Sequence, residues 1–274
     1  MQLRKAVRSA AKLRIGLSAT SGSGKSYGAL LIAKGLCGDL SKVAIIDTEN
    51  GSADLYAHLG NYNVLTLNVF SPEKYIEAID TCEKAGMEVI IIDSITHEWN
   101  FLLEIHGAMS GNSFTNWAYI TPRHEKFKNK ILQSSCHIIT TVRRKTEYAI
   151  DQSSGKTKIE KVGTKEQSRE GWEYELTVNL EIDENHKAKA SKDRTGIFVD
   201  RDLFVITEED GKTLREWSLG DSSEIEASLQ IALVEINNSS SKEELTIVYT
   251  KFKALQENPA FIDAVKNKNA TFVA

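Results

Sequence analysis

The fold is decided by the eight residues that join the first apolar run of the chain to the helix-length stretch after it, Ala19-Thr20-Ser21-Gly22-Ser23-Gly24-Lys25-Ser26. They follow the pattern G-x-x-x-x-G-K-[ST], except that Ala19 replaces the first glycine. Alanine is still a small residue at the tight exit from a strand. Because a strand-like run precedes the pattern and a helix begins near Lys25, the pattern predicts a loop that binds the phosphates of a nucleoside triphosphate.

Each residue type in this loop suits phosphate chemistry. Gly22 and Gly24 let backbone N–H groups turn inward around phosphate oxygens, and the helix that follows adds the positive end of its dipole. Lys25 is expected to bridge the β- and γ-phosphate oxygens, and Ser26 to ligate Mg²⁺. We therefore expect ATP and Mg²⁺ as cofactors, with residues 19–26 as the binding loop.

Outward from this loop, residues 12–142 alternate short apolar runs with helix-length amphipathic stretches. Five of the runs are strand candidates, and the apolar ones are nearly continuous and β-branched, as expected of strands buried on both faces. They are residues 12–18, 42–47, 64–70, 88–93 and 137–142. The alternation predicts an α/β fold with a mainly parallel, twisted sheet flanked by helices.

The stretch between the third and fourth runs carries the signals of a helix. Ser71 is placed to cap its start, Pro72 occupies the first helical position, and Gly86 can take the left-handed position after its end. Ile76, Ile79 and Cys82 give it an apolar face.

The pattern changes after residue 143. Residues 143–169 are polar and charged, with Ser153-Ser154-Gly155 as a turn between two short alternating segments. Alternation with one polar face then predicts antiparallel strands at residues 172–183, 187–191, 202–207 and 213–219. Amphipathic helices are predicted at residues 225–236 and 242–255 and from Pro259 onward. We expect an ATPase core over residues 1–219, with a flexible hairpin or loop at about 145–169, and a small helical region over 220–274.

A second motif places a carboxylate beside the phosphate loop. Four apolar residues, Val89 to Ile92, end in Asp93. Asp93 therefore lies at the carboxyl end of a buried strand, where an aspartate holds Mg²⁺ through water or through the serine of the loop. The predicted metal site is Ser26 with Asp93.

The residue after this aspartate is Ser94, where AAA+ ATPases usually carry the glutamate that orients the attacking water. The end of the second strand offers a carboxylate instead, because Asp47 and Glu49 are two residues apart on the same side of an extended chain. Here the sequence resembles the RecA-like family, in which a strand-end D-x-E carries the catalytic glutamate. The resemblance implies that Glu49 is catalytic and that Tyr56 stacks on adenine.

Two further segments extend the resemblance. Lys192-Asp193-Arg194-Thr195-Gly196 looks like the K-x-R-x-G element of DnaB-like helicases and RadA-like recombinases. It implies that Lys192 and Arg194 reach a neighbouring subunit's ATP site and offset charge on the γ-phosphate, so that the active enzyme is a homo-oligomer, either a ring or a filament. At the end of the fifth strand, Thr141 is the candidate sensor of the γ-phosphate, with Arg143 or Arg144 as alternatives.

Residues 12 to about 200 resemble the phage-encoded branch of RecA-like NTPases, on the loop and on the segments DTENGSADLY, IIIDSITHEW, TNWAYITPRH, HIITTVRRKTEY, REGWEYEL and HKAKASKDRTG. The resemblance implies an ATPase that acts on single-stranded DNA in recombination or annealing, with single-strand-binding or recombination proteins as further partners. The alternatives are a KaiC-like regulatory or assembly ATPase with protein partners and no nucleic acid, and a DnaB-like helicase-related motor. A small-molecule kinase is disfavoured because no arginine-rich lid is evident.

The charge pattern allows DNA contact only through local patches, since 34 basic and 38 acidic residues give a net charge of −4. The family's DNA-binding loops correspond to residues 107–117 and 145–169. The second loop is nearly neutral, with six basic and five acidic residues over 145–170, and Tyr148 is able to stack on a base. Other basic features are, near the N-terminus, Arg4, Lys5, Arg8, Lys12 and Arg14, and, on one helix face, Arg123, Lys126 and Lys130.

The composition excludes several other classes of protein. The apolar runs are only a handful of residues long, so no membrane span is predicted, and the basic N-terminus lacks the apolar core of a secretory signal. Three widely spaced cysteines indicate reduced core thiols rather than a disulfide framework or a zinc site. We expect a cytoplasmic protein, in the bacterial host if the chain is phage-encoded.

Overall fold

The computed structural model describes residues 11–151, 158–220, 222–256 and 258–272; the described side chains exclude those of residues 146–164, 222–224 and 227. The chain divides into two compact units. One unit comprises residues 12–215, and the other comprises residues 216–274 together with the N-terminal residues up to 11.

The larger unit is built on one eight-stranded sheet. Seven of the strands lie in the order β3-β2-β4-β5-β1-β7-β8, and the eighth, β6, pairs with β5. The pairs from β3 across to β7 are parallel, whereas β8 is antiparallel to β7 and β6 is antiparallel to β5. This arrangement confirms the predicted α/β class with an antiparallel extension. The strands are β1 (Arg14–Ala19), β2 (Val43–Asp47), β3 (Asn63–Thr66), β4 (Val89–Asp93), β5 (His137–Asp151), β6 (Lys158–Glu166), β7 (Val178–Ile182) and β8 (Ala188–Asp193).

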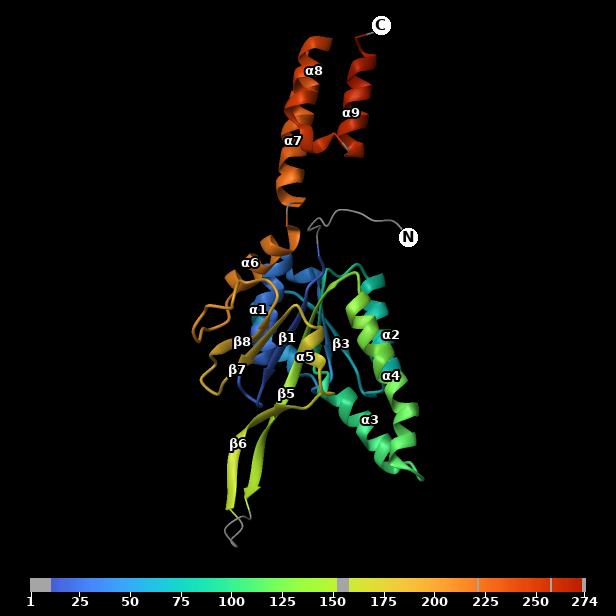
Figure 1. Cartoon of the computed structure of the whole chain (residues 1–274), viewed down its shortest axis with the longest axis vertical. Helices are drawn as coiled ribbons and strands as arrows, with labels where there is room; N and C mark the ends of the chain where they lie inside the picture. Colours follow the sequence, from blue (N-terminus) through green and yellow to red (C-terminus); the bar gives the residue numbers. More distant parts are fainter. Residues whose placement is uncertain (1–10, 152–157, 221, 257, 273–274) are drawn as a thin grey trace. The chain divides into compact units, whose positions relative to one another are not determined.

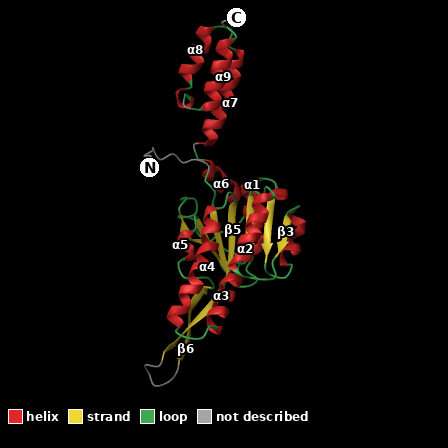
Figure 2. Cartoon of the chain, turned by 90° about the vertical axis from the view of Figure 1, so that its right-hand side faces the viewer, coloured by secondary structure: helices red, strands yellow, loops and turns green. Residues whose placement is uncertain are grey.

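Helices cover both faces of the sheet (Figures 1 and 2). Helix α1 (Lys25–Cys37) packs on one face, against β1, β4 and β5. Helices α2 (Pro72–Lys84) and α4 (Ser113–Gln133) pack on the other, in a core that includes Ile46, Ile92 and Ile138 of the strands with Ile79 and Phe127 of the helices. Short 3-10 turns, η1 (Leu40–Lys42) and η2 (Ser52–Leu59), flank β2, and α3 (Thr96–Ala108) follows β4.

The predicted signals of α2 are confirmed. The Ser71 side chain accepts a hydrogen bond from the Lys74 N–H, and Pro72 is the first residue of the helix. Gly86 has a φ of 76°, the left-handed conformation expected just beyond the helix end.

The predicted antiparallel region is only partly correct. The run at 172–183 begins with a short helix, α5 (Trp172–Glu175), and only Val178–Ile182 form a strand, β7. Gly171 enters α5 with a φ of 87°, and Trp172 is buried in the main core. At 202–207, only Phe204 pairs with the sheet, through an isolated bridge to Ala188.

The predicted strand at 213–219 is wrong, because these residues belong to helix α6 (Glu208–Leu219). Asp210, Leu214 and Ser218 are buried at a spacing of four residues, which is a helical period. The start of the helix carries a capping signal that the alternation concealed: the N–H and hydroxyl of Thr207 donate to the Asp210 carboxylate at 2.7 and 2.9 Å.

The predicted hairpin is present. The outer half of β5 pairs with β6 in a register that runs from Arg144 opposite Glu166 to Asp151 opposite Lys158. The predicted turn at Ser153–Gly155 lies outside the described residues. Because β5 is one continuous strand, the arm formed with β6 grows directly out of the central sheet (Figure 1).

The smaller unit contains helices α7 (Ser222–Asn238), α8 (Lys242–Lys251) and α9 (Pro259–Ala270), with the turn η3 (Lys253–Leu255), as the sequence predicts. They enclose a separate core of Ala232, Ile236, Leu245, Val248, Leu255 and Phe261. Among the described residues, no helix combines the length and the apolar composition that a membrane span requires.

Helices α1 and α6 touch through two glycines. A Cβ atom on Gly211 would lie 2.3 Å from the Ile32 carbonyl oxygen, and one on Gly35 would lie 2.1 Å from the Glu208 carbonyl oxygen. Both obstacles are backbone atoms, so neither can be relieved by turning a side chain.

We predict that Gly211→Ala destabilises the protein by about 1–3 kcal/mol, because the added methyl group forces the two helices apart. The matched control is Gly107→Ala near the end of α3, where a Cβ meets open space; there we expect a gain of up to about 1 kcal/mol from helix propensity. Urea unfolding monitored by circular dichroism measures both. Equal midpoints for the two variants would contradict the close helix contact.

Candidate active site

The loop at residues 19–26 connects β1 to α1 as predicted. Gly22 and Gly24 have φ values of 83° and 91°, a conformation that favours glycine and turns successive N–H groups toward one side. The ammonium group of Lys25 donates to the carbonyls of Ala19 and Thr20 at 3.3 and 2.9 Å. Burial lowers the pKa of Lys25, against the raising effect of Asp93 and Glu49.

A pocket of about 540 Å³ lies against this loop. Its walls bring together residues from six separated parts of the chain. They are the loop with the start of α1, the segment after β2, the end of β4, the middle of β5, the end of β7 with the turn after it, and residues 205–206. Of the residues predicted from the sequence, it contains Ser21, Gly22, Ser23, Gly24, Lys25, Ser26, Glu49, Tyr56 and Asp93.

Asp93 is the centre of a polar cluster at the end of β4. One carboxylate oxygen accepts a hydrogen bond from Ser26 and the other accepts one from Thr141. Asp93 is buried, and burial raises the pKa of its carboxyl group. A carboxylate and a hydroxyl oxygen side by side match the oxygen ligands that Mg²⁺ prefers, so Ser26 and Asp93 fit the metal pair predicted from the sequence.

Thr141 does not lie where a γ-phosphate sensor is expected. It is fully buried, and its hydroxyl is hydrogen-bonded to Asp93 rather than exposed on the pocket wall. Its contact orients the Asp93 carboxylate. Of the alternatives, Arg143 lines the pocket, whereas Arg144 forms an ion pair with Glu181 of β7 at 2.6 Å. The side chains alternate along the strand, so consecutive arginines face opposite sides of the sheet.

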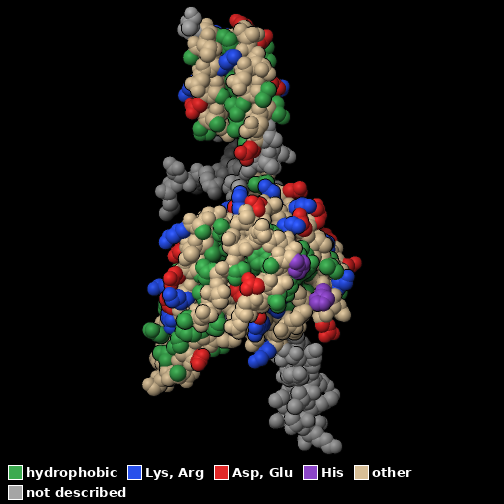
Figure 3. Space-filling model, turned by 180° about the vertical axis from the view of Figure 1, so that it is seen from behind, with side chains coloured by type: hydrophobic (Ala, Val, Ile, Leu, Met, Phe, Trp, Pro, Cys, Tyr) green, Lys and Arg blue, Asp and Glu red, His purple; other side chains and the backbone are tan. Residues whose placement is uncertain are grey.

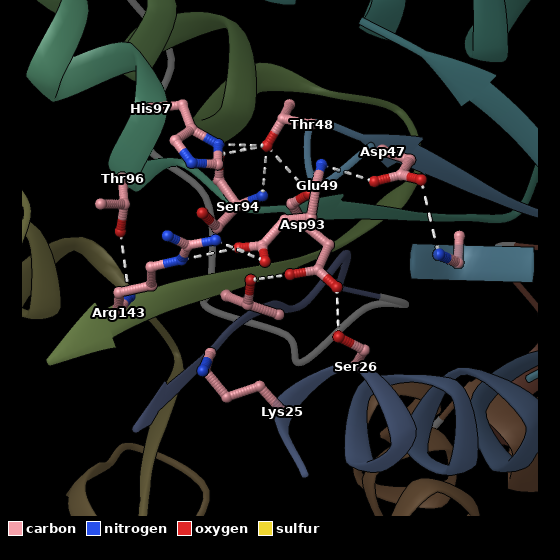
Figure 4. A network of polar contacts seen from close by, with 12 residues as sticks. Lys25, Ser26, Asp47, Thr48, Glu49, Asp93, Ser94, Thr96, His97 and Arg143 are labelled. Carbon is pink, nitrogen blue, oxygen red and sulfur yellow. Dashed lines mark hydrogen bonds and ion pairs between the residues drawn. The ribbon is translucent and has the colours of Figure 1, made fainter. Parts of the chain in front are cut away.

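Glu49 faces the pocket and is paired with Arg143. The Nε and Nη2 atoms of Arg143 lie 2.9 and 2.6 Å from the two carboxylate oxygens (Figure 4). Burial alone raises the pKa of Glu49, but hydrogen bonding and the positive charge of Arg143 outweigh it and hold the pKa below its usual value. Glu49 is therefore ionised at neutral pH.

Asp47 and Thr48 hold the segment that carries Glu49. Asp47 is buried, and its carboxylate accepts the Glu49 N–H at 2.7 Å. The Thr48 hydroxyl accepts the Ser94 N–H at 2.8 Å and lies 2.7 Å from Nδ1 of His97 (Figure 4). These bonds join the ends of β2 and β4 to the start of α3. The D-x-E pattern identified the two acids, but it did not indicate that Asp47 positions the backbone.

Several residues of the pocket were missed by sequence reasoning. Tyr27 lines the pocket, and its ring lies 5.9 Å from that of Tyr56. The only sequence signal for Tyr27 as a pocket residue is its position directly after Ser26 of the loop. His186, Val205 and Ile206 come from the segments around β8. No local pattern marks them, because only the antiparallel return of the chain at β7–β8 brings them to the loop.

Lys192 and Arg194 lie away from the pocket of their own chain. Lys192 donates to the carbonyls of Glu173 and Tyr174, and Arg194 donates to the Tyr174 carbonyl at 2.8 Å. On β7, Ile182 is level with the phosphate loop, and β8 runs back from there, so that Lys192 pairs with Asn179 toward the opposite end of the sheet. Within one chain, Lys192 and Arg194 are therefore not among the residues that line the pocket.

Of the eight basic residues predicted to form these surfaces, the structure describes five, and three of those five are engaged within the chain. Arg14 is buried and donates to four backbone carbonyls, so it is not available to DNA. Arg123 is paired with Glu73, and Lys130 with Asp80 and Glu83, because this face of α4 lies against α2. Lys12 and Lys126 are exposed; Arg4, Lys5 and Arg8 and the side chain of Tyr148 lie outside the described part of the chain.

Residues 107–117, predicted as a DNA-binding loop, form the tip where α3 turns into α4. Phe114 is 86% exposed and Tyr119 is 59% exposed. Behind them the Trp117 ring is stacked between those of His106 and Trp99, at 4.1 and 5.9 Å. Hydrophobic side chains gather on this projecting tip (Figure 3). The tip thus presents exposed aromatic rings in front of a stack of three half-buried rings.

Residues 11–205 match the model of a protein family that is described as the AAA domain. No curated protein matches the chain. Among solved structures, it is similar to a KaiC-like protein from the hyperthermophilic archaeon Pyrococcus horikoshii, with 18% identity and a TM-score of 0.41 over 67% of this chain and 80% of that one.

Proposed function

We infer, from the premise that this chain belongs to the AAA-domain family over residues 11–205, that it binds ATP with Mg²⁺ in the pocket beside residues 19–26 and hydrolyses it. The AAA-domain family consists of P-loop NTPase domains. We propose in addition that the nucleotide is ATP, that the metal is Mg²⁺ and that the bound ATP is hydrolysed. The observation that carries it is the convergence of Lys25, Ser26, Glu49 and Asp93 on one pocket.

In the proposed reaction, the N–H groups of the loop and the ammonium of Lys25 bind the phosphate oxygens. Lys25 exchanges its bonds to the Ala19 and Thr20 carbonyls for phosphate oxygens. Ser26 and Asp93 would hold Mg²⁺, which neutralises charge on the β- and γ-phosphates when bound. The ionised carboxylate of Glu49 accepts a hydrogen bond from the attacking water and orients it toward the γ-phosphorus. Tyr56 is the proposed partner of the adenine ring.

We predict that Lys25→Ala abolishes ATP binding and turnover, whereas Glu49→Gln keeps binding and lowers turnover by about 100-fold or more, as removal of a general base does. Phosphate release and nucleotide binding are measured separately. The control is Glu104→Gln, an exposed glutamate on α3, which should match the wild type. Unchanged turnover in Glu49→Gln would remove this residue from the mechanism.

We also propose that the active form is a homo-oligomer, a ring or a filament, in which Lys192 and Arg194 of one copy serve the next copy's pocket. Two observations support this proposal. Both cations lie away from their own phosphate loop, and their present partners are carbonyl oxygens, which they can leave without stranding a buried carboxylate.

The trans arrangement predicts complementation. Lys25→Ala and Arg194→Ala should each be inactive alone. An equal mixture should regain activity at roughly a quarter of the sites, where by chance a copy with an intact loop lies next to a copy with an intact Arg194. A mixture of Lys25→Ala with Glu49→Gln should stay inactive, because both residues belong to the same half of the site. If the first mixture also stays inactive, or if a dilute Arg194→Ala monomer is fully active, the proposal that Arg194 serves the next copy's pocket fails.

For the biological role we propose single-stranded DNA as the ligand, in recombination or annealing in the host cytoplasm of a phage. The exposed rings at the α3–α4 tip support it, because bases stack on aromatic side chains whatever their sequence. The alternative is a regulatory or assembly ATPase whose aromatic tip binds a protein. The observation that favours this alternative is that three of the four basic side chains of α4 form ion pairs within the chain.

We predict that single-stranded DNA stimulates ATP turnover, less so at higher salt. Phe114→Ala should weaken DNA binding by about tenfold or more, since stacking of one base contributes about 1–3 kcal/mol. Ile247→Ala on α8, which is 65% exposed, is the control and should leave binding unchanged. Turnover that ignores DNA at both salt concentrations would favour a protein partner instead.

A further inference from the structure

Arg143 and Glu49 form an ion pair with each other inside the proposed nucleotide pocket. Two nitrogen atoms of the guanidinium lie 2.9 and 2.6 Å from the two carboxylate oxygens, and both residues line the pocket wall. The pairing is bidentate, the strongest geometry available to these groups. A water that Glu49 is to orient has to share a carboxylate oxygen with Arg143 or displace it.

The backbone at Arg143 is fixed while its side chain is not enclosed. Its N–H donates to the Thr96 hydroxyl at 2.9 Å, and its carbonyl accepts the Gln167 N–H at 2.8 Å. The side chain keeps 37% of its surface exposed. Turning about its own bonds therefore moves the guanidinium within the pocket without moving β5.

The position on β5 places Arg143 beside the proposed metal carboxylate. Thr141 and Arg143 are two residues apart and so face the same side of the sheet, and the Thr141 hydroxyl is bonded to Asp93. Among the described residues that line the pocket, Lys25 and Arg143 carry full positive charges. A terminal phosphate held between Lys25 and the Ser26–Asp93 pair thus has Arg143 as the other cation in the same pocket.

A terminal phosphate competes with Glu49 for this arginine. Its oxygens carry more negative charge than one carboxylate, and they match the two parallel N–H groups of a guanidinium equally well. We propose that Arg143 has two alternative partners, the Glu49 carboxylate and the terminal phosphate of a nucleoside triphosphate. Transfer of Arg143 to the phosphate frees a carboxylate oxygen of Glu49 for the attacking water. The inference rests on the proposed function.

The electrostatics of Glu49 agree with this exchange. The groups that act on it are Arg143 from β5, His97 from α3 and Lys25 from α1, and Asp93 faces the same pocket from β4. Burial raises the pKa of Glu49, and Arg143 is the main group that lowers it. When Arg143 moves to the phosphate, the pKa of Glu49 rises toward its usual range, and the carboxylate becomes a better acceptor of a proton from water.

The test compares the binding of ADP with that of the non-hydrolysable analogue adenosine β,γ-imidotriphosphate, so that turnover plays no part. In Arg143→Gln, ADP binding should be unchanged, and the preference for the triphosphate should fall by about tenfold, the loss expected of hydrogen bonds to a charged group. In Glu49→Gln, triphosphate binding should tighten, because Arg143 no longer has to leave a carboxylate.

The double variant Glu49→Gln/Arg143→Gln separates exchange from simple charge effects. Removing a carboxylate from the pocket strengthens triphosphate binding in any case, so the exchange predicts a larger gain when Arg143 is present than in the Arg143→Gln background. Equal gains in the two backgrounds would overturn the inference, as would an unchanged triphosphate preference in Arg143→Gln. The coupling is measured by a double-mutant cycle.

Two further variants complete the design. Arg144→Gln changes the next residue of β5, which is paired with Glu181 outside the pocket, and should leave the triphosphate preference intact. Arg143→Lys keeps the charge without the bidentate fork and should retain part of the preference. If the wild type binds neither nucleotide, the proposed function itself fails and the exchange with it. If it binds both and the cycle shows no coupling, only the exchange fails.

Discussion

The site depends on the register of the parallel strands. Asp47 pairs with Asp93 across β2 and β4, and Ala19 pairs with Arg143 across β1 and β5. Parallel strands end at the same edge of a sheet, so this register delivers the phosphate loop, both acidic strand ends and Arg143 to one place. A slip of one residue would turn each of these side chains to the opposite face. The apolar strand interiors, buried on both sides, are what hold the register.

The charges gathered at this edge are tolerated because each has a partner. Asp93 accepts from two hydroxyls, Glu49 from Arg143, and Lys25 donates to two carbonyls. A buried ion without such partners would cost several kcal/mol. In the proposed reaction these bonds are replaced by bonds to phosphate, metal or water. The charged side chains of the pocket therefore have partners both with and without bound ligands. The α3–α4 tip follows β4 in the chain, and the β5–β6 arm continues β5.

Local patterns predicted the central elements well, because the signals that define them are local. Four of the five strands, the caps of α2 and the phosphate loop all follow from apolar runs, cap residues and glycines that act within a few residues. The third predicted strand, residues 64–70, is only partly correct, because β3 ends at Thr66 and lies largely exposed at the edge of the sheet. The segment at 213–219 shows the limit. Its alternation suggested a strand, but the Thr207–Asp210 cap and the close approach of Gly211 to α1 make it a helix. Basic residues in sequence likewise suggested a DNA surface, but Arg14, Arg123 and Lys130 have partners that come from distant parts of the chain.

The sequence by itself therefore determined the α/β class, the phosphate loop and the identity of the acids at the strand ends, since each depends on residue type and short spacing. Tertiary structure alone decided which partner each charge takes. In the folded chain, the Thr141 hydroxyl donates a hydrogen bond to Asp93 and Glu49 is paired with Arg143. Lys192 and Arg194 instead bind backbone carbonyls away from their own pocket. The physical reason is that a hydrogen bond or an ion pair requires two groups within about 3 Å, and no local pattern records which distant groups the sheet brings that close.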